Sequence, residues 1–519
     1  MLPHTHVAFR CADAALQRLY DEAVCKCRSN LNRFGEDIVL VEGGGYEKIW
    51  LETQPMGGEM YAPYNLQAAL NNHLLFMRHQ RADGRIAGSI QGFPDGAVEA
   101  QFNKFQGFCF PWPALNMYYW LGEDRDYLDR LANCLERFDA YLWRVRDSNG
   151  DGLLESWCKY DTGEDNAVRY GAAPNYALGE EPPRDCDVVP MASMDVTSFS
   201  YACRDTLCEI SRIRGDGREG EWCEKAEAVA RVLREKLWDA ERGALFDRDK
   251  HGNKVDVLCH NTLRCMYWGS VSQEMADRFV QEHLLNPEEF WTQLPLPSVA
   301  ANDPAFRNAP ENNWSGQCEG LTYQRAILAL ERYGYDKLVP VLGKKLMQAV
   351  IDGGYLFTQQ YDPFTGKPSI VDPETKEPLP EVGQSPRQAL CLGKDETEVG
   401  QSPTSGSDCL HNAPRSPRQA LCLGRAEIQD AYGPTLLSVL TYIAHIWGVT
   451  MVRGNIWFSL GSGMACEYEL GWGEHTYRIE SDGEKARMLV DGKEIAVSRC
   501  GVRFITDQAG NVLRRVEIE

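Results

Sequence analysis

Four polar segments hold the side chains that are best suited to chemistry. One of them, YDTGEDNAVRY at 160–170, combines several acids with one base. The residues of interest there are Asp161, Glu164, Asp165 and Arg169, with Trp157 just upstream. Clustered carboxyl groups beside an aromatic ring can raise the pKa of one member, which can then serve as a general acid. A solvated acidic loop is the alternative interpretation.

The segment RDSNGDGLLESW at 146–157 alternates oxygen-bearing side chains around two glycines. The predicted ligands are Asp147, Asn149, Asp151 and the carbonyl of Leu153. Oxygen ligands at alternate positions of a tight turn suit a hard cation such as Ca²⁺. Glu155 stands at position 9 and not at position 12, which excludes an EF-hand. A polar turn without an ion is the other interpretation.

The segment at 290–335 combines tryptophans with amides and a carboxylate. The candidates for contacts to a ligand are Trp291, Asn312, Asn313, Trp314, Gln317, Glu319 and Gln324. Aromatic faces and hydrogen-bonding side chains together suit a polyhydroxyl ligand. Alternatively, the segment is a buried helix start with Trp314 in the core. The fourth segment, FTQQYDPFTGKPS at 357–369, carries Gln359 and Tyr361 and by itself predicts only a polar turn.

Helical periodicity predicts the elements that position these segments. Apolar residues recur at helical spacing in 65–80, 224–238, 321–333, 338–350 and 435–447. Between the helices lie long segments, among them the aromatic stretch 107–120, which we expect to be a loop. This alternation predicts helix hairpins stacked in a ring, with loops converging on one face.

The chain is expected to have two domains. Residues 1–448 form the helical domain, and the β-rich, turn-punctuated residues 449–519 form a small antiparallel β domain. The segment 384–425 fits neither domain, because it contains SPRQALCLG twice and is rich in Ser, Pro and Gly. We interpret it as an inserted surface loop without chemistry.

Composition limits the partners. The formal charge of −21 and the lack of a Lys/Arg-rich stripe argue against binding to nucleic acid. No apolar stretch is long enough to span a membrane, and the first residues do not resemble a secretory signal. The 18 cysteines are scattered without paired CxxC motifs, so we expect no zinc site and unpaired thiols in the cytoplasm. Oligomeric state is left open.

Taken together, the segments resemble the family 63 glycoside hydrolases and their trehalase-like relatives over most of 40–447. The stretches that carry the resemblance are, in order, RDSNGDGLLES, TGEDNAVR, NPEEFWTQLPLPSVAANDPAF, NNWSGQ, LERYGY and QQYDPFTG. The resemblance implies an all-α fold class, an (α/α)6 toroid of six hairpins. It also implies an inverting α-glycosidase that needs no cofactor for its chemistry and acts on a small carbohydrate. Asp165 occupies the place of the general acid, and some relatives bind a structural Ca²⁺ at the segment resembling DSNGDG.

The second catalytic carboxylate is missing from its expected place, where this chain has Gln359. An amide cannot deprotonate water, so we expect Glu319 to replace it, with Glu52 and Glu311 as weaker candidates. The stretch YEKIWLETQPMGGEMY loosely resembles the family's sugar-binding loop. The predicted substrate-binding residues are Trp50, Glu52, Trp112, Trp157, Glu164, Arg169, Trp314, Gln317, Gln359 and Tyr361. A phosphorylase, in which phosphate attacks without a base, and an inactive sugar-binding protein are the alternative functions.

Overall fold

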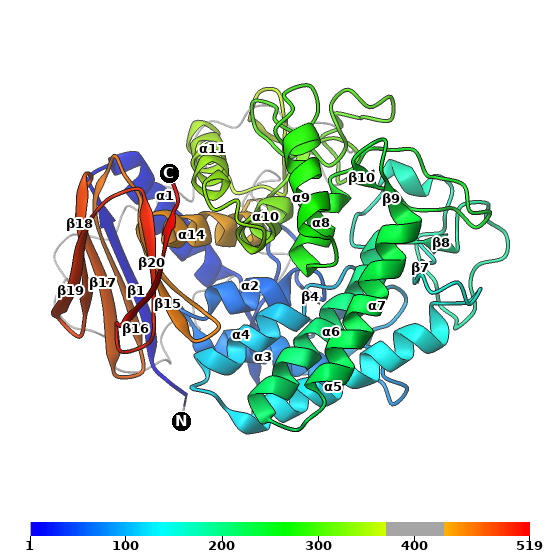
Figure 1. Ribbon diagram of the computed structural model, residues 1–519, viewed down its shortest axis with the longest axis horizontal. Coiled ribbons are helices and arrows are strands. Elements are labelled where there is room, and N and C mark those ends of the chain that lie inside the picture. The colour runs from blue at the N-terminus through cyan, green and yellow to red at the C-terminus, as the bar shows by residue number, and fades with distance from the viewer. Residues whose placement is uncertain (1, 370–429) are drawn as a thin grey trace.

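The computed structural model describes residues 2–369 and 430–519 (Figure 1). The expected inserted loop, 384–425, lies outside these residues. Six helices form an inner ring, and each contacts the next in chain order until the last contacts the first. They are α2 (Gln54–Tyr61), α4 (Pro111–Trp120), α6 (Met194–Arg214), α8 (Asn261–Trp268), α10 (Gly320–Arg332) and α14 (Gly433–Trp447). The predicted ring of hairpins is confirmed.

Each inner helix packs against one outer helix to form a hairpin. The outer helices are α1 (Ala14–Ser29), α3 (Leu66–Arg78), α5 (Arg125–Val145), α7 (Glu219–Leu237), α9 (Gln273–Phe279) and α11 (Leu338–Asp352). A π-helical turn, Val280–Leu284, extends α9. The outer helices are amphipathic: α5 buries Leu128, Leu131, Leu135 and Leu142 on one stripe and is capped by Asp124.

The inner helices are buried on most sides, and this is why the aromatic stretch 107–120 was misinterpreted. Its second part is the inner helix α4, not a loop. Pro111 stands in its first turn, where its missing N–H costs nothing. A helix that is apolar all round gives no amphipathic period, so only its length and its neighbours in space identify it.

The inner helices begin at one end of the ring and finish at the other. At the first end, Asp195 of α6 accepts a hydrogen bond from Asn261 of α8 at 2.8 Å. At the other end, His445 of α14 lies 2.8 Å from Glu331 of α10, and the Trp120 carbonyl of α4 accepts a hydrogen bond from Trp472. The loops that precede the inner helices therefore gather at the first end, and the β strands cover the second.

Two antiparallel sheets cover that second end (Figure 1). One has the order β1-β16-β17-β18-β19 and the other β14-β15-β20-β21. The strands are β1 (Thr5–Cys11), β14 (Val449–Val452), β15 (Asn455–Leu460), β16 (Ala465–Trp472), β17 (His475–Asp482), β18 (Lys485–Val490), β19 (Lys493–Arg499), β20 (Val502–Thr506) and β21 (Val512–Glu517). The C-terminal run of strands starts with β14 at Val449, and β1 from the N-terminal end of the chain pairs with β16; the division into domains 1–448 and 449–519 stays a prediction.

The loops of the ring carry further short strands, so "all-α" is too narrow a label. They form the sheets β2–β3, β4-β5-β6, β7–β8, β9–β10 and β11-β12-β13. Their bounds are Leu31–Phe34, Asp37–Leu40, Ile49–Trp50, Ser89–Gly92, Val98–Gln101, Glu155–Ser156, Met191–Ala192, Trp238–Asp239, Ala244–Leu245, Cys318–Glu319, Gln360–Tyr361 and Pro368–Ser369. A 3₁₀ turn spans Val168–Tyr170. These strands fix the loops at the first end of the ring.

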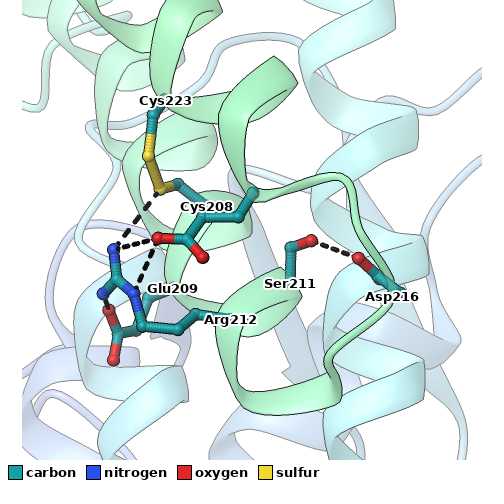
Figure 2. Close-up of a disulfide and its surroundings, with 7 residues drawn as sticks. Cys208, Glu209, Ser211, Arg212, Asp216 and Cys223 are labelled. Carbon is teal, nitrogen blue, oxygen red and sulfur yellow. Dashed lines mark hydrogen bonds and ion pairs between the residues drawn. A yellow bond between two sulfur atoms is a disulfide. The ribbon is translucent and has the colours of Figure 1, made fainter.

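One disulfide differs from the expectation of unpaired thiols. Cys208 of α6 and Cys223 of α7 are bonded to each other and cross-link this hairpin (Figure 2). Beside them, Arg212 contacts Glu209 and Glu219, and Ser211 donates to Asp216 in the connecting turn. Among the helices within 2–369 and 430–519, none is both long and apolar enough to cross a bilayer.

Candidate active site

Asp165 lies at the loop end of the ring, between β7 and the 3₁₀ turn. Its carboxylate accepts one hydrogen bond from the Gln106 amide at 3.2 Å and one from the Asn312 amide at 3.3 Å. Burial raises the pKa of Asp165 above its ordinary value, and the charge of Lys104 and these two hydrogen bonds offset part of the rise. Two amide donors hold the carboxyl in place without an ion pair that would force it to stay charged.

The two neighbouring acids are committed to arginines. Asp161 lies 2.6 Å from Arg146, and its pKa is lowered mainly by that charge against the cost of burial. Glu164 pairs with Arg169 and with Arg264, the latter at 2.9 Å, and its pKa is held well below the usual range. Arg169 therefore neutralises Glu164 and does not oppose protonation of Asp165. Of the three acids in this loop, Asp165 is the one that can carry a proton.

Gln359 belongs to the same hydrogen-bond network. The Tyr46 hydroxyl donates to the Gln359 carbonyl oxygen at 3.0 Å, and the Gln359 amide donates to Asn312 at 3.2 Å. Asn312 in turn donates to Asp165. The structure thus links Gln359 to Asp165 through one intervening side chain, and the group at this place is an amide.

Three other carboxyl groups surround the Tyr46 network. Glu319 is fully buried, and neither of its oxygens has a hydrogen-bond partner. Burial raises its pKa well above the ordinary value, and the charges of nearby acids add to this. Glu52 pairs with Arg325, yet burial still raises its pKa to about 7. Both residues lie near Asp165, whose charge is among the influences that raise their pKa values.

Glu42 was not found from the sequence. It lies two residues after the end of β3 and directly before Gly43, and it accepts a hydrogen bond from the Tyr432 hydroxyl at 3.2 Å. Burial raises its pKa well above the ordinary value, while Tyr432 and Lys104 lower it. The pKa of Tyr46 is raised first by burial and then by the charges of Glu42, Asp165 and Glu319, so these carboxyls surround that hydroxyl. A carboxylate directly followed by three glycines is the signal that could have identified it.

Lys104 was also missed. Its ammonium lies over three aromatic rings, at 4.9 Å from Trp50, 4.8 Å from Tyr160 and 5.2 Å from Tyr176. The residue is 7% exposed, and in the described part of the chain its ammonium has no ion-pair or hydrogen-bond partner. Burial lowers its pKa, and the charge of Asp165 is the largest opposing influence. A desolvated cation therefore stands close enough to Asp165 for the two charges to interact, and its donors are uncommitted.

The structure corrects three of the predicted substrate-binding residues. Trp157 is fully buried, stacks on Arg146 at 4.2 Å and donates to Glu155, so it supports the loop from inside. Tyr361 is fully buried and donates to the Leu356 carbonyl. Trp112 lies at the opposite end of the ring, in a cavity described below. All three are aromatic, and aromatic rings serve a core as readily as a sugar site.

Trp314 and Gln317 stand behind the site. Trp314 is 3% exposed and packs edge-on against His260, which itself bonds to Glu164. Gln317 donates to Asn308 at 3.0 Å and makes no contact with the Asp165 network. Trp50 and Glu164 lie in the site region: the Trp50 ring contacts the ammonium of Lys104, and Glu164 is next to Asp165 in the chain. The tryptophan of the NNWSGQ stretch is therefore core, as its alternative interpretation proposed.

The predicted cation-binding segment forms a hydrogen-bonded turn. Asp151 accepts from the Leu153 N–H at 2.8 Å, Asn149 from the Asp151 N–H at 3.0 Å, and Asp147 from the Gly152 N–H at 3.3 Å. Backbone groups of the turn thus use one oxygen of each predicted side-chain ligand. The donor set, all oxygens, still suits Ca²⁺, and binding of the ion stays a prediction.

Comparisons with known proteins identify the family of this chain and structures that share its fold. The family model for the mannosylglycerate hydrolase MGH1-like glycoside hydrolase domain matches residues 61–376. A mannosylglycerate hydrolase from Rubrobacter radiotolerans is 22% identical over 290 residues, which are 47% of this chain and 64% of that protein. The chain thus aligns with less than two thirds of that relative's length.

Solved structures share the fold. The GH63 mannosylglycerate hydrolase from Thermus thermophilus in complex with glucose has a TM-score of 0.54 at 20% identity, covering 67% of this chain and 95% of that one. A sialidase has a TM-score of 0.63 at 12% identity, covering 97% of this chain and 42% of that one. An α-L-rhamnosidase from Dictyoglumus thermophilum has a TM-score of 0.52 at 11% identity, covering 94% and 44%. Since the family model spans more than half of the chain, the protein belongs to the MGH1-like glycoside hydrolase family, and it shares the fold of the GH63 mannosylglycerate hydrolase.

Proposed function

We propose that the protein is an inverting α-glycosidase that hydrolyses a small glycoside whose leaving group carries a carboxylate. Asp165 is the general acid. The observation that carries this assignment is that Asp165 alone among its neighbouring acids is buried without an ion pair, and is held by the amides of Gln106 and Asn312. A carboxyl in this state can donate its proton to the glycosidic oxygen as the bond breaks.

We assign the general base to Glu42. In an inverting reaction, water attacks the anomeric carbon and gives its proton to the base, while the bond to the leaving oxygen breaks and that oxygen takes the proton of Asp165. The anion of Glu42 is stabilised by the Tyr432 hydroxyl and by the charge of Lys104, whereas the charges that act on Glu319 are those of Glu52, Asp165 and Glu164, which disfavour its anion. Glu42 therefore replaces Glu319 as the proposed base.

The carboxylate on the leaving group follows from Lys104. Groups beside the general acid contact the leaving group, and Lys104 is the uncommitted cation at this place. The relatives from Rubrobacter and Thermus are named as hydrolases of mannosylglycerate, in which glycerate supplies such a carboxylate. The rings of Trp50, Tyr160 and Tyr176 hold the ammonium in place by cation–π contacts.

The test is to measure hydrolysis of mannosylglycerate and of mannosylglycerol, its neutral counterpart, by Lys104→Met. We expect KM for the anionic glycoside to rise by about 10- to 100-fold, because one charge-assisted hydrogen bond is lost. KM for the neutral glycoside should change little. The matched control is Lys48→Met, because Lys48 also stacks on Trp50, at 5.3 Å, but donates to Gln101. Equal effects on both substrates would contradict the role of Lys104.

The reaction type is tested separately. Proton NMR of the first product distinguishes inversion from retention, and Glu42→Gln should abolish turnover while Glu319→Gln retains most of it. The presence of Gln359 keeps a phosphorylase as the second candidate, because phosphate would need no base. Release of a sugar phosphate that depends on added phosphate would favour it. No sugar release under either condition would favour a sugar-binding protein.

A further inference from the structure

A cavity of about 640 Å³ lies at the end of the ring opposite Asp165. Its walls come from inner helices, among them the first turn of α4, the middle of α6 and the last turn of α10, and from the hairpin β14–β15 of the β region. This volume is typical of a site for a small molecule. Trp112 of α4 and Trp457 of β15 are among its aromatic residues, and both are partly exposed. Nothing in the proposed glycosidase chemistry uses this cavity.

Two arginines line the cavity without an acidic partner. In the described residues, neither Arg332 nor Arg453 forms an ion pair, and Arg332 makes one side-chain hydrogen bond, to the Trp268 carbonyl at 2.8 Å. Burial lowers the pKa of Arg453, and the like charge of Arg332 lowers it further. The two guanidinium groups are thus close enough to repel each other in a place that is poor in water.

Most of the other ionisable side chains of the wall have partners of their own. Glu331 is bound by Arg503 and His445, and Arg234 pairs with Glu227 at 3.1 Å. The wall also holds Glu59, which accepts hydrogen bonds from Trp120 and Asn116 and whose pKa burial raises to about 7. The charges of Asp205, which lies in the wall, and of Glu209 act on Arg453, but Glu209 is itself paired with Arg212, so few acids face the two guanidinium groups.

Arginine is an unfavourable residue for the backbone conformation at position 453. It stands in the two-residue turn of the β14–β15 hairpin with φ of 48°, followed by Gly454 with φ of 75°. Both turn residues have positive φ, and Asn or Gly is preferred at the first of them. An arginine here places its guanidinium 5.9 Å from the centre of the Trp112 ring.

We propose that this cavity is a second binding site, which takes a sugar-sized molecule with one anionic group between Arg332 and Arg453 and packs its apolar face on Trp112. An anion between the guanidinium groups removes their repulsion, and phosphate and carboxylate both fit this role. The site is independent of the substrate assigned to the active site.

The experiment is calorimetric titration of the full chain with glucose 6-phosphate, glucuronate, inorganic phosphate and glucose. We expect glucose 6-phosphate or glucuronate to bind at least 10-fold more tightly than glucose, and the two arms distinguish phosphate from carboxylate. Arg453→Asn should weaken this binding at least 10-fold while keeping or raising the Tm, because Asn suits the turn. This variant therefore separates loss of a ligand contact from loss of the fold.

Two further variants define the location. Arg499→Gln removes an exposed arginine of β19 and should leave binding unchanged, and so should Lys104→Met in the active site. Anionic probes that bind no better than glucose would overturn the proposal. So would binding that persists in both Arg453→Asn and Arg332→Gln, or that disappears in Lys104→Met. If inorganic phosphate binds as tightly as glucose 6-phosphate, the proposal that the ligand is sugar-sized is wrong.

Discussion

At the scale of single residues, the site depends on which acids have a cation and which do not. Asp161 and Glu164 stand within four residues of Asp165, yet arginines hold both as anions. Those anions are fixed parts of the wall. Asp165 has amide donors instead, so its charge can change during the reaction. The same chain segment thus supplies structural carboxylates and one that can transfer a proton.

Replacing Asp165 by Asn should reduce turnover of a natural glycoside by about 10² to 10⁴-fold, because an alkoxide leaving group needs the proton. A glycosyl fluoride needs no such proton, so its hydrolysis should be nearly unaffected. Steady-state kinetics on both substrates measure the difference. Near-normal activity of Asp165→Asn on the natural glycoside would remove the assignment.

The pH dependence should report the charge of Lys104. A general acid must be protonated, so activity falls as the pH rises through the pKa of Asp165. Lys104 lowers that pKa, and Lys104→Met should therefore move the alkaline limb of kcat/KM to higher pH. The neutral glycoside is the substrate for this measurement, because binding then does not involve Lys104. A shift to lower pH, or none, would show that the two groups are not coupled.

Some residues of this site could be predicted from sequence motifs, and the others could be identified only from their positions in the folded structure. Asp165 and Gln359 were predicted from motifs, and the structure joins them through Asn312. Glu42 and Lys104 come from loops more than 50 residues upstream in the chain, and only the closed ring brings them to Asp165. Their surroundings give them a role that no local pattern expresses.

At the scale of elements, the amphipathic outer helices were the easier to predict. The range 224–238 corresponds to α7 and 338–350 to α11, because each buries one stripe. The inner helix α4 was taken for a loop, since nearly every side chain in it is buried. The short sheets of the loops were missed because two-residue strands such as β7 and β12 have no period.

The turn at 147–153 tests the calcium expectation. Its backbone N–H groups are already satisfied by Asp147, Asn149 and Asp151, so the turn closes without an ion. Ca²⁺ bound there would therefore add little to a turn that is already closed, and we expect a chelator to change the Tm by less than about 1 °C, well below the shift of roughly 2–4 °C per kcal/mol for domains of 150–250 residues. A fall of several degrees that calcium restores would establish a bound ion.

At the scale of the whole molecule, a buried charge network joins the ring to the β region. Arg503 of β20 is fully buried and lies 2.6 Å from Glu331 at the end of α10 and 3.3 Å from Asp336. It also donates to the His445 carbonyl of α14 and to Ser459 of β15. One guanidinium therefore links two inner helices to the sheet that covers their ends.

Removing this link should be costly and should change the response to acid. The charge of Arg503 is the main influence that overcomes burial and lowers the pKa of Glu331 from 4.5 to about 2. Because the folded-state pKa is depressed, the pair stabilises the fold fully above the unfolded pKa, and this stability is lost as the pH falls from about 4.5 towards 2. Arg503→Met leaves Glu331 buried without this partner, and we expect a loss of about 3–5 kcal/mol at neutral pH.

The difference in unfolding free energy between Arg503→Met and the unaltered protein should therefore shrink as the pH falls through that window. Urea unfolding at several pH values measures it. Arg515→Met is the matched control, because Arg515 pairs with Glu517 at 3.3 Å on the surface and such pairs contribute about 0–1 kcal/mol. A constant difference between pH 7 and 3 would show that Glu331 does not depend on Arg503 for its charge.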